Sequence, residues 1–174
     1  PRKEAPVLNA RIRKRWAQGR FPVGMIGPAG IDLTYGAQHL GEGPSVLSAL
    51  LDGSHPFAAT LKAAQKPMLI LGRGAIARAD GAAVVAAAWR LAAESGMLKP
   101  DWHGFNLLHH FGGQVGALEL GFLPGQGGKD LAAMLGGGVD ALWLLNADGF
   151  DPARIPASTF VIYQGHHGDA MAAP

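Results

Sequence analysis

The sequence predicts an α/β fold, in which a doubly wound, mostly parallel sheet carries helices on both faces in a Rossmann-like arrangement. Two observations support this prediction. Short unbroken apolar runs, at residues 67–71 and 141–145, are typical of parallel strands that are covered on both faces. These runs alternate with segments of helical periodicity, and such alternation favours a parallel sheet with right-handed crossovers.

The first half of the chain is expected to open on an amphipathic helix over residues 4–16. Its apolar residues Ala5, Leu8, Ile12 and Trp16 recur at helical spacing. The elements expected next are a short strand, two helices, a buried strand and an Ala-rich helix, at residues 22–27, 44–51, 56–65, 67–71 and 81–95. No strand stands ahead of the first helix, which favours a missing strand before Pro1.

The second half is expected to continue the same alternation. A weak strand candidate, two short helices and two apolar strands occupy residues 105–108, 114–120, 129–135, 141–145 and 160–163. A length of 174 residues suits one domain with a sizeable core. We therefore expect residues 1–174 to form a single α/β domain that is incomplete at both ends.

Composition excludes several kinds of chemistry. Apolar residues make up 48% of the chain and charged residues 16%, as in a folded protein with a weakly charged surface. The absence of cysteine removes disulfides, thiolate nucleophiles and ordinary iron–sulfur clusters from this segment. No apolar run approaches the roughly 20 residues that a membrane-spanning helix needs, so no direct membrane insertion is expected.

The net charge of +2 is unevenly distributed, because the N-terminal segment is strongly basic. Residues 1–20 contain seven arginines and lysines and a single acidic residue, Glu4. This basic face is either a solvated helix surface or a contact for an acidic or phosphate-bearing partner. Nucleic-acid binding is not expected, because no aromatic platform or recognised binding module accompanies the charges.

The glycine-rich turn after the strand at residues 67–71 resembles a dinucleotide-binding motif. Gly72, Gly74 and Ala77 fit G-x-G-x-x-[GA], in which backbone approaches a pyrophosphate at a helix N-terminus. Two features oppose that interpretation. The next helix is expected to start at Asp80, a carboxylate, and no ribose-binding acid follows the next strand candidate. A simple tight turn is the alternative.

Polar residues follow the last two strands, at the position where open α/β sheets bind ligands. Asn146 and Asp148 follow one strand, and Gln164 and His166 follow the other. A metal site is a weaker hypothesis. The pairs His109–His110 and His166–His167 diverge in direction, and only His166 with Asp169 would make a partial site.

Several motifs together resemble one known family. They are, in chain order, residues 2–13, 66–72, 80–83, 145–149 and 163–169. These segments resemble the large iron–sulfur subunit of proton-pumping NADH–quinone oxidoreductase, respiratory complex I, which is called the G subunit in bacteria. The resemblance runs from about Pro1 to Pro174, and it is specific because distinct motifs occur in the family's order.

The resemblance implies a slice of the subunit's C-terminal region, which is similar to molybdopterin-dependent oxidoreductases such as formate dehydrogenase. In those enzymes the loops that match Gly72–Gly74, Asn146–Asp148 and Gln164 help to hold a pterin dinucleotide. The complex I family is understood to have lost that cofactor. We therefore expect no catalytic residue, no metal and no cofactor here, and a vestigial crevice at Gly72, Gly74, Asn146, Asp148, Gln164 and His166.

The resemblance also implies partners and a place in the cell. The parent complex passes electrons from NADH through iron–sulfur clusters to quinone and pumps protons. Its 4Fe-4S and 2Fe-2S clusters would lie outside this segment, which would act as a scaffold against other complex I subunits and the cluster-bearing part of its own polypeptide. The complex lies on the cytoplasmic face of the bacterial inner membrane or on the mitochondrial matrix side. The alternative is a working pterin- or nucleotide-binding domain.

Overall fold

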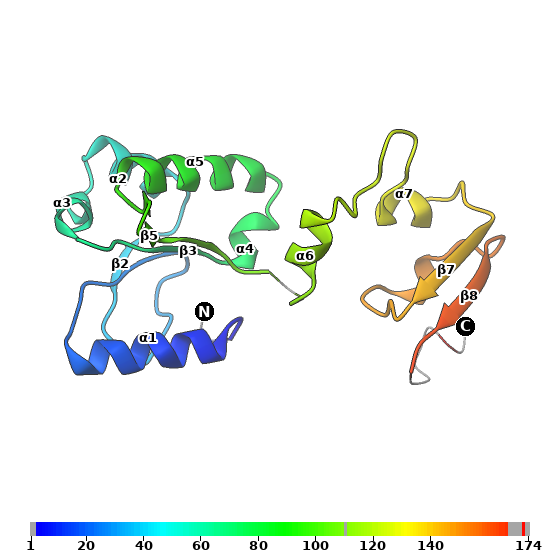
Figure 1. Cartoon of the computed structure of the whole chain (residues 1–174), viewed down its shortest axis with the longest axis horizontal. Coiled ribbons are helices and arrows are strands. Elements are labelled where there is room, and N and C mark those ends of the chain that lie inside the picture. The colour runs from blue at the N-terminus through cyan, green and yellow to red at the C-terminus, as the bar shows by residue number, and fades with distance from the viewer. Residues whose placement is uncertain (1–2, 110, 167–171, 173–174) are drawn as a thin grey trace. The chain divides into compact units, whose positions relative to one another are not determined.

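The computed structural model describes residues 3–109, 111–166 and 172. The chain forms two compact units, unit 1 (Pro1–Gly112) and unit 2 (Gly113–Pro174), and each is described by itself. Helices and short, mostly parallel sheets occur in both (Figure 1). The chain is therefore a mixed α/β protein, as its sequence predicts, while the single-domain prediction for residues 1–174 stays a prediction.

Unit 1 begins with α1 (Pro6–Gln18), which has its proline in the first turn. The predicted stripe of Ala5, Leu8, Ile12 and Trp16 is half-buried, but Asn9 is the most buried side chain, at 6% exposure. The Asn9 side-chain amide donates to the Leu33 carbonyl (3.3 Å) and accepts from the Tyr35 hydroxyl (3.1 Å). A buried, satisfied amide thus attaches α1 to the chain that follows it.

The remaining elements of unit 1 follow the predicted order, with additions. They are β1 (Gly24–Ile26), β2 (Gln38–Gly41), α2 (Ser45–Asp52), α3 (Phe57–Ala63), β3 (Leu69–Leu71), α4 (Arg73–Ile76), α5 (Gly81–Glu94), β4 (Leu98–Lys99), β5 (Trp102–His103) and β6 (Phe105–Leu107). The sequence did not predict β2, α4, β4 or β5. Two of the sheets are parallel pairs, β1 with β2 and β3 with β6, and β4 with β5 is antiparallel.

The core of unit 1 lies between α2, α5 and the β3–β6 pair. Its buried side chains come from helix and strand alike and include Leu50, Leu71, Leu91 and Phe105. Trp89 of α5 packs at the edge of this core. Its ring lies edge-on to the ring of Phe105, with 5.2 Å between the ring centroids. The β3–β6 pair is therefore covered by α5 from its own unit, as Figure 1 shows.

Unit 2 contains α6 (Gln114–Glu119), α7 (Leu131–Leu135), β7 (Ala141–Leu145), a 3-10 turn (Pro152–Arg154) and β8 (Phe160–Gln164). β7 and β8 form a parallel pair in which Trp143 is opposite Ile162. The Asp130 carboxylate caps α7 by accepting from the Ala133 amide (2.8 Å). The described residues thus hold four two-stranded sheets, and not one continuous sheet.

Candidate functional site

The six predicted crevice residues divide between the two units. Gly72 and Gly74 belong to unit 1, whereas Asn146, Asp148, Gln164 and His166 belong to unit 2. The part of the predicted crevice in each unit is therefore described by itself, and the crevice as a whole stays a prediction.

The glycine turn of unit 1 connects β3 to α4. Gly72 has extended backbone, and α4 begins immediately after it at Arg73. The Ala-rich helix does begin after Asp80, as predicted, but the sequence did not predict α4, a single helical turn that precedes it. A helix N-terminus does follow the strand, as in a nucleotide-binding turn.

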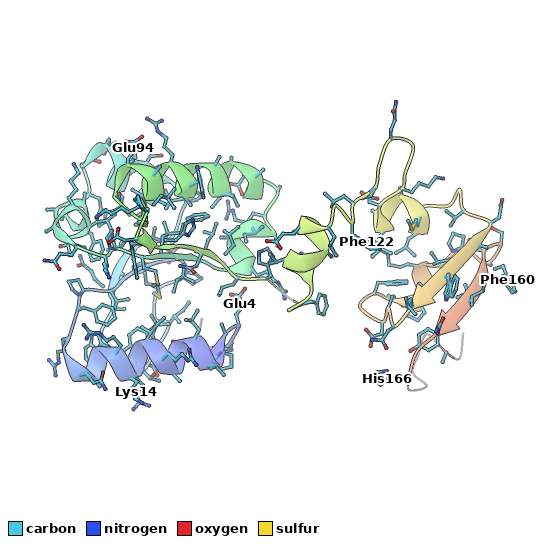
Figure 2. The ribbon with its side chains drawn as sticks, viewed as in Figure 1. Glu4, Lys14, Glu94, Phe122, Phe160 and His166 are labelled. Atoms are coloured by element: carbon cyan, nitrogen blue, oxygen red, sulfur yellow. The ribbon has the colours of Figure 1, made fainter. Side chains whose placement is uncertain are left out.

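A carboxylate from the start of the chain occupies that turn. The Arg73 backbone N–H donates to Oε1 of Glu4 over 2.6 Å. The second oxygen, Oε2, lies 3.1 Å from the position that a Cβ atom on Gly72 would take. Figure 2 shows the Glu4 side chain directed at the first turn of α4. The chain thus places its own negative charge where a phosphate would approach.

The two glycines differ in what surrounds them. A Cβ at Gly72 would lie close to Glu4, whereas a Cβ at Gly74 would meet no atom within 4 Å. The first glycine therefore leaves room for a side chain of the same protein. Packing among the described residues does not require a glycine at position 74.

Asp80 precedes α5 as predicted, but its carboxylate does not cap the helix. It pairs instead with the guanidinium of Arg78, over 2.6 Å to Oδ1 and 2.9 Å to Oδ2. The hydrogen bonds and charge of Arg78 hold the pKa of the Asp80 carboxyl below its ordinary value. The tight approach of α4 to α5 is permitted by Gly81, where a Cβ would collide with the Ile76 carbonyl oxygen.

The polar residues after β7 and β8 partly converge. The Asn146 backbone N–H donates to the Gln164 carbonyl (2.7 Å), which extends the parallel pairing by one step. Nδ1 of His166 donates to Oδ1 of Asn146 over 3.0 Å. Asn146 has φ of 49°, in the left-handed region that Asn tolerates better than most residues. The structure therefore brings together Asn146, Gln164 and His166.

Asp148 does not join this cluster. It lies exposed in the loop after β7 and makes no hydrogen bond or ion pair with the described residues. In the part of the chain that the structure describes, no three His, Cys, Asp or Glu side chains are placed to hold a metal ion. His110, His167 and Asp169, which the metal hypothesis also used, lie outside the described residues.

The basic face of α1 is largely directed to solvent. Arg11, Arg13 and Lys14 are exposed and pair with no described residue. Arg15 donates to the Gly19 carbonyl (3.1 Å), and Arg20 lies over the Trp16 ring, 5.2 Å from its centroid. Among the described residues, no helix is both long and apolar enough to cross a bilayer.

Sequence reasoning missed the part that Glu4 plays. The residue was counted only as the single acid of a basic segment, and its contact with Arg73 joins positions 69 residues apart. No local signal pointed to this contact, because the residues just before Glu4 in the sequence, Arg2 and Lys3, are themselves cations.

Comparison with known proteins identifies the class. The model of the molybdopterin oxidoreductase family matches residues 1–173, so the chain belongs to that family. Its curated relatives are more specific, and they confirm the resemblance to the complex I subunit. The NADH-quinone oxidoreductase G subunit of Rickettsia felis is 40% identical over 174 residues, which cover 99% of this chain and 24% of the relative.

Two further relatives agree. The NADH dehydrogenase (ubiquinone) iron–sulfur protein 1 of Solanum tuberosum is 39% identical over 97% of this chain and 22% of its own length. The NADH-ubiquinone oxidoreductase 75 kDa subunit of Reclinomonas americana is 37% identical over 97% of this chain and 24% of its own length. The chain thus spans about a quarter of the length of these relatives.

Proposed function

We propose that this chain is a non-catalytic scaffold module of the large iron–sulfur subunit of NADH–quinone oxidoreductase. The relatives carry that name or an equivalent one. The parent complex would pass electrons from NADH to quinone and pump protons, while this segment would hold the peripheral arm together.

The contact between Glu4 and α4 is the observation that carries the scaffold proposal. In a molybdopterin enzyme the cofactor's phosphates need backbone N–H groups and positive potential. Here the Arg73 N–H already donates to a carboxylate, and a phosphate at the same turn would meet a like charge a few ångströms away. The residues present therefore do not fit a pterin dinucleotide at this turn.

The proposal extends to the architecture of the whole subunit. The three parallel pairs, β1–β2, β3–β6 and β7–β8, are compatible with pieces of one doubly wound, Rossmann-like sheet. In that arrangement residues 1–174 would belong to a single domain completed by sequence on both sides.

Partners, clusters and location follow from the same assignment. The module would contact other complex I subunits and the cluster-bearing part of its own polypeptide. The 4Fe-4S and 2Fe-2S clusters would lie outside residues 1–174. The assembly would lie on the cytoplasmic face of a bacterial inner membrane, or on the matrix side in mitochondria.

A second candidate function is a working pterin- or nucleotide-binding domain. It is favoured by the Asn146, Gln164 and His166 cluster, because non-glycine residues in the left-handed region, such as Asn146, cluster at ligand sites. The open space at Gly74 would also admit a ligand atom.

A cofactor assay on the full-length subunit separates the two candidates. The purified protein is denatured, its extract is oxidised with iodine, and the fluorescent pterin products are quantified beside molybdenum by elemental mass spectrometry. The scaffold proposal predicts far less than one pterin and one molybdenum per polypeptide. A stoichiometric pterin would replace it with the second candidate.

A further inference from the structure

One face of the β7–β8 pair is apolar and open. Side chains alternate along both strands, and the residues on the outer face include Trp143 at 65% exposure, Leu145 at 67%, Phe160 at 68% and Ile162 at 44%. The strand register sets Trp143 directly opposite Ile162. Figure 2 shows Phe160 projecting from the sheet. We call this surface, formed by Ala141, Trp143, Leu145, Phe160, Ile162 and Gln164, the outer face.

The inner face of the same pair is already covered from within unit 2. Leu142 and Leu144 are 8% and 3% exposed. Met134 of α7 packs on them, as do Phe150 and Ile155 from the connection between β7 and β8. The elements of unit 2 that pack on this small core therefore lie on the inner side.

The outer face has the composition of a buried surface. None of its six residues is charged, and its four large apolar side chains occupy neighbouring positions on adjacent strands. A contiguous apolar patch of this size is among the largest that a free surface carries, and such patches often mark contacts. Parallel strands, moreover, occur almost only where both faces are covered.

We propose that the outer face is covered by an uncharged face of an α-helix from the remainder of the longer polypeptide. This inference rests on the proposed function, since it takes the chain to be part of such a polypeptide. Helices are the elements that cover parallel sheets. A pair of strands about 5 Å apart matches a single helix roughly 10 Å across. The relatives carry more than three quarters of their length outside the matched region, which supplies the covering segment.

A second copy of the chain fits this surface less well. Four apolar side chains at these exposures offer roughly 500 Å² per copy, whereas a standard interface buries about 800 Å² on each partner. A helix of the same polypeptide needs no such minimum, because joining it to the sheet costs no translational freedom of a separate molecule.

Thiol labelling tests the occupant directly, since residues 1–174 contain no cysteine. Ala141→Cys places a small probe on the outer face, opposite Phe160. Ser158→Cys is the matched control, because Ser158 is exposed, lies just before β8 and is nearly the same size as cysteine. Leu145→Cys repeats the probe at the other end of the face. Labelling by N-ethylmaleimide is followed at these peptides by mass spectrometry, in the isolated 174-residue chain, the full-length subunit and the assembled complex.

The expected result is at least tenfold slower labelling of the Ala141→Cys and Leu145→Cys variants in the full-length subunit than in the isolated chain. The Ser158→Cys variant should change less than twofold. Equal labelling in all three samples would overturn the proposal. Slow labelling already in the isolated chain would also overturn it, and a dependence of that rate on concentration would indicate a second copy. Protection that appears only in the assembled complex would overturn it too, because it would indicate that another subunit covers the face. The cofactor assay on the same polypeptide is independent of these rates, so the two proposals can fail separately.

Discussion

Two parallel strand pairs of this chain, β3–β6 in unit 1 and β7–β8 in unit 2, differ in how their faces are covered. In unit 1, α5 packs on the pair and Trp89 closes against Phe105. In unit 2 the inner face has its own cover, while the outer face exposes Trp143 and Phe160. Strands of similar, mostly apolar composition thus differ in how much of their surface the same unit covers. We therefore expect the first pair to owe its stability to unit 1 alone, and the second to depend in part on the covering helix proposed above.

The largest expected effect tests the intrinsic core of unit 1. Leu91→Ala removes a side chain that is 2% exposed and should lower the free energy of unfolding by about 2–5 kcal/mol. Hydrogen exchange resolved by peptide should show faster exchange throughout α2 and α5. The control Leu120→Ala changes a residue that is 89% exposed and should cost less than about 0.5 kcal/mol. Equal effects of the two variants would contradict the assignment of the core.

The next effect concerns the junction of α4 and α5. Gly81→Ala should destabilise unit 1 by about 1–3 kcal/mol, because the new Cβ collides with the Ile76 carbonyl, which is backbone and cannot rotate away. Gly74→Ala is the matched control, since its Cβ meets open space and alanine favours the helix. Urea unfolding measures both. A Gly81→Ala protein as stable as the wild type would show that the junction is looser than described.

A smaller effect is expected at the turn that Glu4 occupies. Glu4→Ala removes the charged acceptor of the Arg73 amide, so exchange of that amide should accelerate several-fold. Glu119→Ala, which changes an exposed acid without a described partner, should leave the same amide unchanged. Nuclear magnetic resonance exchange rates give the answer. An unaltered exchange rate of the Arg73 amide in the Glu4→Ala variant would remove the main support for a turn that the Glu4 carboxylate occupies.

The smallest effect is electrostatic and local to the exposed Arg78–Asp80 pair. Since Arg78 lowers the pKa of Asp80 in the folded chain, the stabilisation from this pair is present above the unfolded pKa and is lost as pH falls through the folded one. An NMR titration should place the pKa of the wild-type Asp80 carboxyl below the ordinary value of about 3.9, and Arg78→Ala should raise it. Identical titrations in both proteins would contradict the pairing.

The sequence predicted those elements whose signal is local. The apolar runs at residues 67–71 and 141–145 became β3 and β7, and the Ala-rich segment became α5. Strand β2 was missed because Gln38 and His39 break any apolar run, and only its pairing with the preceding strand β1 reveals it. An apolar run also cannot reveal which of its faces is covered, and for this reason the open side of β7–β8 was not foreseen.

The candidate site was predicted in composition but not in arrangement. Asn146, Gln164 and His166 were named because they follow strands, and parallel pairing does bring them together. Asp148 was named for the same reason, yet the loop turns it to solvent. Glu4 could not be predicted to reach Gly72 and Arg73, because only the tertiary structure brings the start of the chain to that turn.

Turnover of the assembled complex tests the central claim, that this module is not catalytic, most directly. A triple variant, Gly74→Ala with Gln164→Ala and His166→Ala, alters residues from both parts of the predicted crevice. A Cβ atom at Gly74 would meet no atom within 4 Å, and the described contact of His166 is with Asn146, which is not a core residue. NADH–quinone turnover per assembled complex should stay within about twofold of the wild type, less than about 0.5 kcal/mol in activation free energy. A tenfold or greater loss in a fully assembled complex would contradict the account.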